Sequence, residues 1–280
     1  MKLKISEHFF SWDRPLVMGI LNLTPDSFYD GGSHNNTDDV LRHCEKMLTE
    51  GADIIDIGAF SSRPGPGMEI ISAEEENQRL IPYLIEIKKR FPETIISIDT
   101  FRKDVAKNAI DNGADIINDI SGGLFDKDML SYIGENHVPY IMMHCGGSIE
   151  SLHTNHIKEN ACEIVKSFFE KQIEFLDNYG EQQIILDPGI GFNKSMKSNF
   201  ELLNNIEDYR VNNLPVLIGI SRKSMIYKTL KTTPQEALNG TTVLNTIALM
   251  KGADILRVHD VKEAVEAVKL VNELRAKAVG

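Results

Sequence analysis

Cysteine is scarce in this chain: three residues among 280, at the widely separated positions Cys44, Cys145 and Cys162. An odd number of cysteines with no CxxC spacing argues against a disulfide framework and against a zinc site built from thiolates. Free cysteines fit a reducing compartment. We therefore expect a cytoplasmic protein.

Long apolar runs are also missing, since none approaches the ~18 residues needed to span a bilayer. Polar residues, among them Ser6, Glu7 and Asp13, interrupt the N-terminal segment, which therefore lacks the apolar core of a secretion signal. Basic residues are outnumbered, with 30 Lys and Arg against 41 Asp and Glu, a net charge of -11. Because negative charge repels nucleic acid and anionic lipid, we expect no nucleic-acid or membrane partner.

A GxGxxG fingerprint is absent after the first predicted strand, which argues against a doubly wound open sheet. What recurs instead is a short apolar run followed by a longer segment with helical spacing. These runs are mostly continuous rather than alternating, which is typical of parallel strands covered on both faces. The predicted strands are residues 16–21, 54–58, 95–98, 116–120, 140–143, 184–186, 216–220 and 255–258.

Between the strands, apolar residues at helical spacing predict helices over residues 38–50, 73–90, 103–112, 157–179 and 261–277. A weak repeat, GADI, marks three passages from helix to strand, where glycine is expected to end the helix. No linker or low-complexity tract divides the chain. Eight strands alternating with helices predict an α/β protein: a (β/α)8 TIM barrel forming a single domain over residues 1–280.

Polar residues gather where the predicted strands end, which is the functional face of such a barrel. Taken singly, each could be a turn former or a helix cap. Together they indicate a site, because buried charge is costly unless a ligand or partner compensates it. The residues are Asn22, Ser62, Arg63, Asp99, Asn118, His144, Asp187, Ser221, Arg222, Lys223, Arg257 and His259.

Two chemical groups stand out among these residues. Carboxylates and an amide, with one lysine as a donor, suit a planar heterocycle that has an amino-pyrimidine edge. Cations that converge from different strands suit a phosphate or diphosphate. The first group is Asp99, Asn118, Asp187 and Lys223, and the second is Arg63, Arg257 and His259.

The segments that carry these residues resemble the dihydropteroate synthase family. Residues 18–32 (MGILNLTPDSFYDGG) and 61–65 (SSRPG) are similar to its first two signatures. Later segments match in order: residues 98–100 (IDT), 117–122 (INDISG), 186–192 (LDPGIGF), 219–224 (GISRKS) and 257–260 (RVHD). A long string and several ordered blocks, spread over nearly the whole chain, are far more specific than one short motif.

The resemblance implies a transferase of folate biosynthesis. It would condense 6-hydroxymethyl-7,8-dihydropterin diphosphate with 4-aminobenzoate, giving 7,8-dihydropteroate and pyrophosphate. It would also be a sulfonamide target, and members of the family are usually homodimers. The second signature departs from the usual pattern, because Phe60 stands where an acid is common and Ser62 where threonine is common.

The resemblance also implies a role for each site residue. Asn22 would bind the Mg2+ that accompanies the diphosphate. The diphosphate would be held by Ser62, Arg63, Arg257 and His259. The pterin would be held by Asp99, Asn118, Asp187 and Lys223. The 4-aminobenzoate would be held by Phe28, Pro64, Phe192 and Ser221. The catalytic set would be Asp30, Arg63, Lys223, Arg257 and His259.

Three other interpretations stay open at this point. A folate-dependent methyltransferase domain would share the acidic pterin pocket but would not need a diphosphate grip. A silent paralogue would bind pterin without synthase activity. A barrel aldolase would use Lys223 to form a Schiff base, with Arg222 depressing its pKa.

Overall fold

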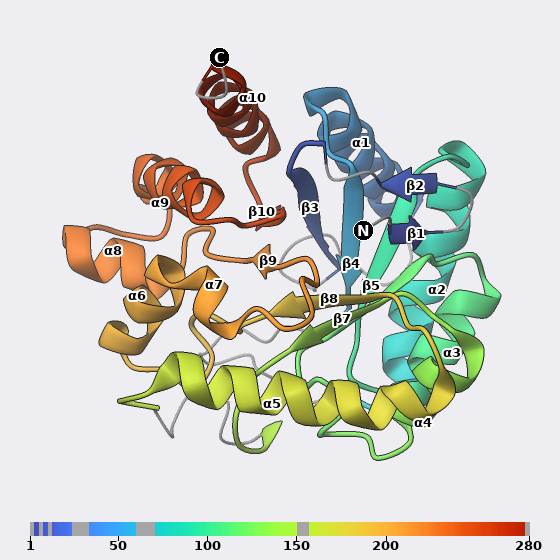
Figure 1. The fold of residues 1–280 in the computed structure, drawn as a ribbon. Coiled ribbons are helices and arrows are strands. Elements are labelled where there is room, and N and C mark those ends of the chain that lie inside the picture. Colours follow the sequence, from blue (N-terminus) through green and yellow to red (C-terminus); the bar gives the residue numbers. More distant parts are fainter. Residues whose placement is uncertain are drawn as a thin grey trace.

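The computed structural model describes residues 3–5, 8–10, 13–23, 34–59, 71–149 and 157–277. Within them, eight parallel strands form a nearly closed barrel with helices around its outside (Figure 1). The first and last barrel strands, β3 and β10, pair with each other. An isolated bridge between Leu186 and Val216 spans the remaining gap, between β8 and β9. The predicted TIM barrel is therefore confirmed.

The barrel strands lie close to the predicted ranges. They are β3 (Leu16–Asn22), β4 (Ile54–Gly58), β5 (Ile95–Asp99), β6 (Ile116–Asp119), β7 (Tyr140–Met143), β8 (Ile184–Asp187), β9 (Leu217–Ile218) and β10 (Ile255–Val258). Two further strands form an antiparallel hairpin that was not predicted: β1 (Leu3–Ile5) and β2 (His8–Phe10).

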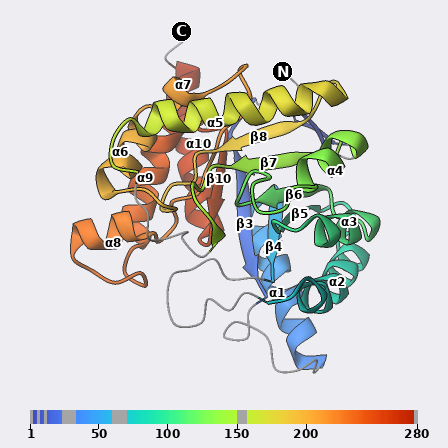
Figure 2. The same cartoon turned by 90° about the horizontal axis from the view of Figure 1, so that it is seen from below.

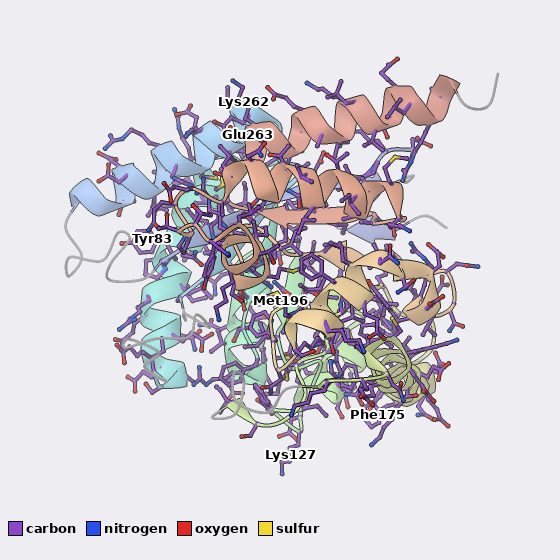
Figure 3. All side chains as sticks on the ribbon, turned by 90° about the vertical axis from the view of Figure 1, so that its left-hand side faces the viewer. Tyr83, Lys127, Phe175, Met196, Lys262 and Glu263 are labelled. Atoms are coloured by element: carbon purple, nitrogen blue, oxygen red, sulfur yellow. The ribbon has the colours of Figure 1, made fainter. Side chains whose placement is uncertain are left out.

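The predicted helices over residues 73–90 and 261–277 agree with α2 and α10, whereas α5 begins only at Ala161, after Asn160 in a left-handed conformation. The helices are α1 (His34–Glu50), α2 (Ala73–Arg90), α3 (Lys103–Asp111), α4 (Met129–Asn136), α5 (Ala161–Leu176), α6 (Met196–Asn204), α7 (Ile206–Tyr209), α8 (Ser224–Leu230), α9 (Leu238–Met250) and α10 (Val261–Lys277). Exposed side chains such as Lys127 and Phe175 lie at the outer edge of the molecule (Figure 3). No helix in the described ranges is long and apolar enough to cross a membrane.

The barrel interior becomes polar towards the carboxyl ends of its strands. Side chains alternate along a strand, so residues of one parity fill the interior and the others pack beneath the helices. The lower interior is an apolar cluster of Leu16, Met18, Ile54, Ile95, Ile116, Ile141, Ile185, Leu217 and Ile255. Two residues further along, the same parity gives Asp56, Ser97, Asn118, Met143, Asp187 and Arg257. The fold thus aims charged groups at one mouth of the barrel.

The repeated GADI segment has a common structure at the opposite, amino-terminal end of the barrel. Each aspartate accepts the backbone N–H of a residue at the start of a neighbouring strand and pairs with a cation from elsewhere in the chain. The sets are Asp53 with Val17 and Arg14, Asp115 with Ile96 and Lys88, and Asp254 with Val216 and Arg210. The repeat therefore stabilises the barrel at the end away from the polar mouth.

Lys88→Met is expected to lower the free energy of unfolding by about 1–3 kcal/mol, because it leaves the carboxylate of Asp115 buried without its cation. The lysine Nζ lies 2.7 Å from Asp115 Oδ2, and the aspartate side chain is 7% exposed. Urea denaturation measures the change. The matched control is Lys89→Met, because the neighbouring Lys89 is 75% exposed. An equally small loss in both variants would contradict the expectation.

Candidate active site

A buried cluster of opposite charges lies at the polar mouth of the barrel. Arg257 on β10 donates from Nε to Asp56 Oδ2 at 2.6 Å and from Nη2 to Asp99 Oδ2 at 2.8 Å. Asn118 on β6 donates from Nδ2 to Asp56 Oδ2 at 3.2 Å. The arginine of the last strand therefore faces the carboxylates of β4 and β5. The structure thus places Arg257 of the cationic group against Asp99 of the other group.

Asp56 was missed in the sequence analysis, although it lies at the centre of this cluster and is fully buried. A signal for it exists in the sequence, because Asp56 is the one charged residue within the apolar run of β4 (IIDIG). Its spacing from Ile54 places it on the interior face of the strand. Asp56 lies in the middle of its strand, and therefore does not belong to the polar residues that mark the strand ends.

Asp187 and Lys223 form a second part of the same mouth. Asp187 ends β8, and its Oδ1 accepts the Gly189 N–H at 2.7 Å. Lys223 donates from Nζ to the Ile190 carbonyl at 2.5 Å, and this Nζ lies 4.6 Å from the centre of the Phe192 ring. Burial lowers the pKa of Lys223 to about 8, although Asp187 opposes the shift.

Burial also dominates the ionisation of the acids. It raises the pKa of Asp187, an effect that Lys223 partly offsets. It raises the pKa of Asp99 to about 7, although the nearby Arg257 acts in the opposite direction, and the charge of Asp56 adds to the rise. A site that holds several acids out of water favours a ligand that supplies hydrogen-bond donors to them.

The shift at Asp99 predicts a pH dependence of stability. Because the pKa rises on folding, the folded state binds more protons than the unfolded state between about pH 4 and pH 7. Asp99 therefore contributes full stability at low pH and loses it as the pH rises towards 7. We expect the difference in unfolding free energy, wild type minus Asp99→Asn, to fall by about 1–3 kcal/mol over that range.

Urea denaturation of both proteins at several pH values measures this difference. Asp104→Asn is a suitable control because Asp104 is 77% exposed. A wild-type minus Asp99→Asn difference that is constant, or that grows with pH, would show that the assigned shift has the wrong sign.

Hydrogen bonds and an ion pair join the segments that follow β9 and β10. His259 Nδ1 lies 3.0 Å from Ser221 Oγ, which also accepts the His259 backbone N–H at 3.2 Å. Arg222 adopts a left-handed conformation with φ 54°, and its Nε and Nη2 each donate to Asp260 at 2.9 Å. Ser221, which follows β9, and His259, which follows β10, therefore contact each other, and their predicted roles in ligand binding stay predictions.

One part of the alternative aldolase interpretation does not hold. Arg222 does not depress the pKa of Lys223, because its guanidinium is paired with Asp260; burial acts first, and Arg257 is the cation that adds to it. His144 also stands apart from the charged cluster. It packs edge-on against Phe168 of α5, with ring centres 5.0 Å apart, and burial lowers its pKa to about 3.

Asn22 is the last residue of β3 and is half-buried beside Gly58 of β4. Across the described part of the chain, no three His, Cys, Asp or Glu side chains gather into a metal-binding cluster. The amide oxygen of Asn22 is nevertheless a hard ligand. Mg2+ commonly binds through one or two protein oxygens together with substrate phosphates and water, so the donor set fits this ion if a diphosphate is present.

Five predicted site residues lie outside the described residues, so their contacts stay predictions. They are Phe28, Asp30, Ser62, Arg63 and Pro64. The same holds for the departure at Phe60. The described residues bring together the predicted pterin group, Phe192, Ser221, Arg257 and His259.

Comparison with known proteins agrees with this geometry. A family model described as pterin binding enzyme matches residues 18–259. Dihydropteroate synthase of Escherichia coli K12 is 41% identical over 273 residues, which cover 97% of this chain and 95% of the relative. The solved Yersinia pestis dihydropteroate synthase with a sulfonamide drug has a TM-score of 0.89 at 38% identity, covering 99% of this chain and all of that one.

A Xanthomonas albilineans dihydropteroate synthase solved with 4-aminobenzoic acid has a TM-score of 0.88 at 33% identity, and 98% of each chain is covered. The family match runs from the first barrel strand to the residue after the last, and therefore includes Asn22, Asp99, Asn118, Asp187, Lys223, Arg257 and His259. The fold and the charged mouth agree with these matches, and the chain therefore belongs to the pterin-binding enzyme family.

Proposed function

We propose that the chain is a dihydropteroate synthase, a transferase that condenses 6-hydroxymethyl-7,8-dihydropterin diphosphate with 4-aminobenzoate and releases pyrophosphate. The observation that carries the proposal is the ion-pair network of Arg257 with Asp56 and Asp99 at the carboxyl end of the barrel. It brings a group able to bind an anion within reach of acids able to bind an amino-pyrimidine. Relatives with this name align over nearly the full chain.

The acids and the amide of the mouth would bind the pterin. A carboxylate accepts the paired N–H donors of an amino-pyrimidine edge, and Asp187 is buried at the end of β8 for this purpose. Asn118 can donate as well as accept, and Lys223 can donate to a ring oxygen or nitrogen. Because Asn118 and Asp187 project from barrel strands, and Lys223 is held by the Ile190 carbonyl, they can hold the ring in one orientation.

The cations would bind the diphosphate. The contacts of Arg257 with the acids use Nε and Nη2, so the N–H groups of Nη1 would be the ones to donate to a phosphate oxygen. His259 follows on the same strand end, and Arg63 and Ser62 are predicted to join it. Mg2+, held by Asn22 and the diphosphate, would supply positive charge to the departing group.

The reaction breaks the bond between the pterin methylene carbon and a diphosphate oxygen and forms a bond from that carbon to the arylamine nitrogen. Pyrophosphate takes the electron pair of the broken bond, and the amine loses one proton to solvent. Arg257 and His259 stabilise the charge on the leaving group. The acids, with Asp30 as predicted, favour the cation on the pterin. A neutral arylamine needs no strong base, which agrees with the lack of an assigned nucleophile–base pair.

The second substrate would lie beside Lys223. Phe192 and Ser221 flank this lysine, and Phe28 and Pro64 are predicted to complete the site. The Xanthomonas relative was solved with 4-aminobenzoic acid and the Yersinia relative with a sulfonamide drug. We extend both ligands to this chain, as substrate and as inhibitor.

A homodimer and a cytoplasmic location also belong to this proposal. Adjacent helices α9 and α10 lie side by side (Figure 2) and expose large apolar side chains. These are Val243, Ile247, Met250, Leu270 and Leu274. Burying such side chains between two copies of the chain would be favourable. Sedimentation velocity gives the mass: a dimer supports this part of the proposal, and a monomer at micromolar concentration contradicts it.

Pyrophosphate release tests the function directly. The purified chain, with Mg2+ and the pterin diphosphate, should release one pyrophosphate for each 4-aminobenzoate consumed, and release should stop when either Mg2+ or 4-aminobenzoate is omitted. Pterin binding without release would identify a silent paralogue or a methyltransferase-type binding domain. Borohydride trapping of a substrate on Lys223 would identify a Schiff-base enzyme.

A further inference from the structure

A second lysine lies under the mouth of the barrel and has no part in the reaction described above. Lys194 stands in the turn between β8 and α6, and only 4% of it is exposed. Its Nζ donates to the backbone carbonyls of His144, Gly189 and Phe192, each at 3.0 Å. The first carbonyl follows β7, and the other two belong to the turn after β8.

Three carbonyls match the three N–H groups of one ammonium ion, so every donor of Lys194 is used. Burial lowers the pKa of Lys194 to about 7, and the nearby charge of Asp187 opposes this shift. None of the described carboxylates forms an ion pair with the nitrogen, so the three carbonyls are the groups that favour its charged form. Burying an ammonium without a paired acid is costly. Its three hydrogen bonds join the end of β7 to the turn after the adjacent strand β8.

The turn to which Lys194 donates its hydrogen bonds is also the turn that contacts Lys223. The Ile190 carbonyl in this turn accepts the hydrogen bond from Lys223 Nζ, and the Phe192 ring lies below the same nitrogen. Phe192 therefore contacts both lysines, one through its carbonyl and one through its ring. A shift of the turn would move the acceptor and the ring that position Lys223.

Gly189 permits this close arrangement. Its φ is 66°, and a Cβ atom on it would stand 1.9 Å from the His144 carbonyl oxygen and 3.2 Å from Lys194 Nζ. Only glycine lets the turn approach the end of β7 closely enough for one ammonium to reach both carbonyls.

We propose that Lys194 is a positioning residue, whose buried ammonium fixes the turn after β8 to the end of β7 and thereby sets the place of Lys223 and Phe192. The kinetic part of this inference rests on the proposed synthase function, and the structural part does not. Lys194 itself touches no reacting atom.

The test compares Lys194→Met, which keeps an unbranched side chain one atom shorter and removes the ammonium, with Lys88→Met. Lys88 bonds a backbone carbonyl, that of Thr94, and an acid at the opposite end of the barrel. Lys194→Met is expected to lower kcat/KM for the pterin diphosphate by about 100-fold, the usual effect of a displaced catalytic group. Lys88→Met should lose stability but keep kcat/KM within about threefold of the wild type.

Hydrogen exchange supplies a measurement that does not depend on activity. The Gly191 N–H, bonded to Asn199 Oδ1, and the Phe192 N–H, bonded to the Gly189 carbonyl, should lose protection in Lys194→Met and keep it in Lys88→Met. If the wild type released no pyrophosphate, the function would be wrong, and exchange alone would decide this inference.

A folded Lys194→Met with wild-type kcat/KM and wild-type protection of the turn overturns the inference, as does an equal kinetic loss in Lys88→Met. If Lys194→Met does not fold, Lys194→Arg decides by the same two measurements, with an expected loss of about tenfold because a guanidinium keeps donors in the wrong geometry.

Discussion

Arg257→Ala is expected to lower kcat by at least ~100-fold, in line with losing a charged contact that strengthens as the leaving group departs. The same change should lower the free energy of unfolding by about 3–5 kcal/mol, because Asp56 and Asp99 stay buried together without their shared cation. Steady-state pyrophosphate release measures the first effect, and urea denaturation measures the second.

Arg210→Ala is the matched control for this variant. Arg210 also pairs with a barrel aspartate, Asp254 at 2.8 Å, but at the opposite end of the barrel. The Arg210→Ala variant should have a lower free energy of unfolding and the kcat of the wild type. Turnover near the wild-type level in Arg257→Ala, or an equal loss in Arg210→Ala, would mean that ion pairing supports the fold and not the chemistry.

Lys223→Ala should also lower kcat by at least ~100-fold. Lys223 contributes its charge at the place where the pterin pocket, the Phe192 ring and the end of β9 meet. Its loss also removes the largest of the effects that offset the raised pKa of Asp187.

The measurement for Lys223→Ala is kcat and KM for the pterin diphosphate, with Lys228→Ala on the exposed side of α8 as the control. A raised KM with an unchanged kcat would assign Lys223 to ground-state binding alone. Wild-type values for both constants would remove it from the site.

The strands and the mouth of the barrel could be predicted from the sequence because they depend on local signals. Continuous apolar runs marked the barrel strands, and the period of two predicted that Arg257 and His259 point to the same face. The helix α10 was predicted to the residue, since its apolar spacing is regular. The helices α4 and α6 to α9 were not assigned from the pattern.

What the sequence could not provide were contacts made by distant segments. The pairing of Asp56 with Arg257 joins residues 201 positions apart, and three carbonyls from two segments converge on Lys194. The aldolase interpretation had Arg222 act on its neighbour Lys223, but the side chain of Arg222 pairs with Asp260 instead. Nearness in sequence does not give the direction of a side chain after a left-handed residue.

Arg257 is the residue on which the account depends most. A guanidinium held only by acids would be a structural ion pair, and one held only by phosphate would be a simple anion site. Here one guanidinium touches the acids of β4 and β5 and stands two residues before His259. The carbon between pterin and diphosphate would therefore lie where both parts of the substrate are held.

Calorimetry of 6-hydroxymethylpterin binding to the wild type, Asp187→Asn and Asp115→Asn tests the location of the pterin pocket most directly. Asp187 ends β8 at the charged mouth, and Asp115 pairs with Lys88 at the far end of the barrel. We predict that Asp187→Asn weakens binding by about 10- to 100-fold, as losing a charged hydrogen bond does, and that Asp115→Asn binds like the wild type. Equal binding by all three proteins would contradict a pterin pocket at this mouth.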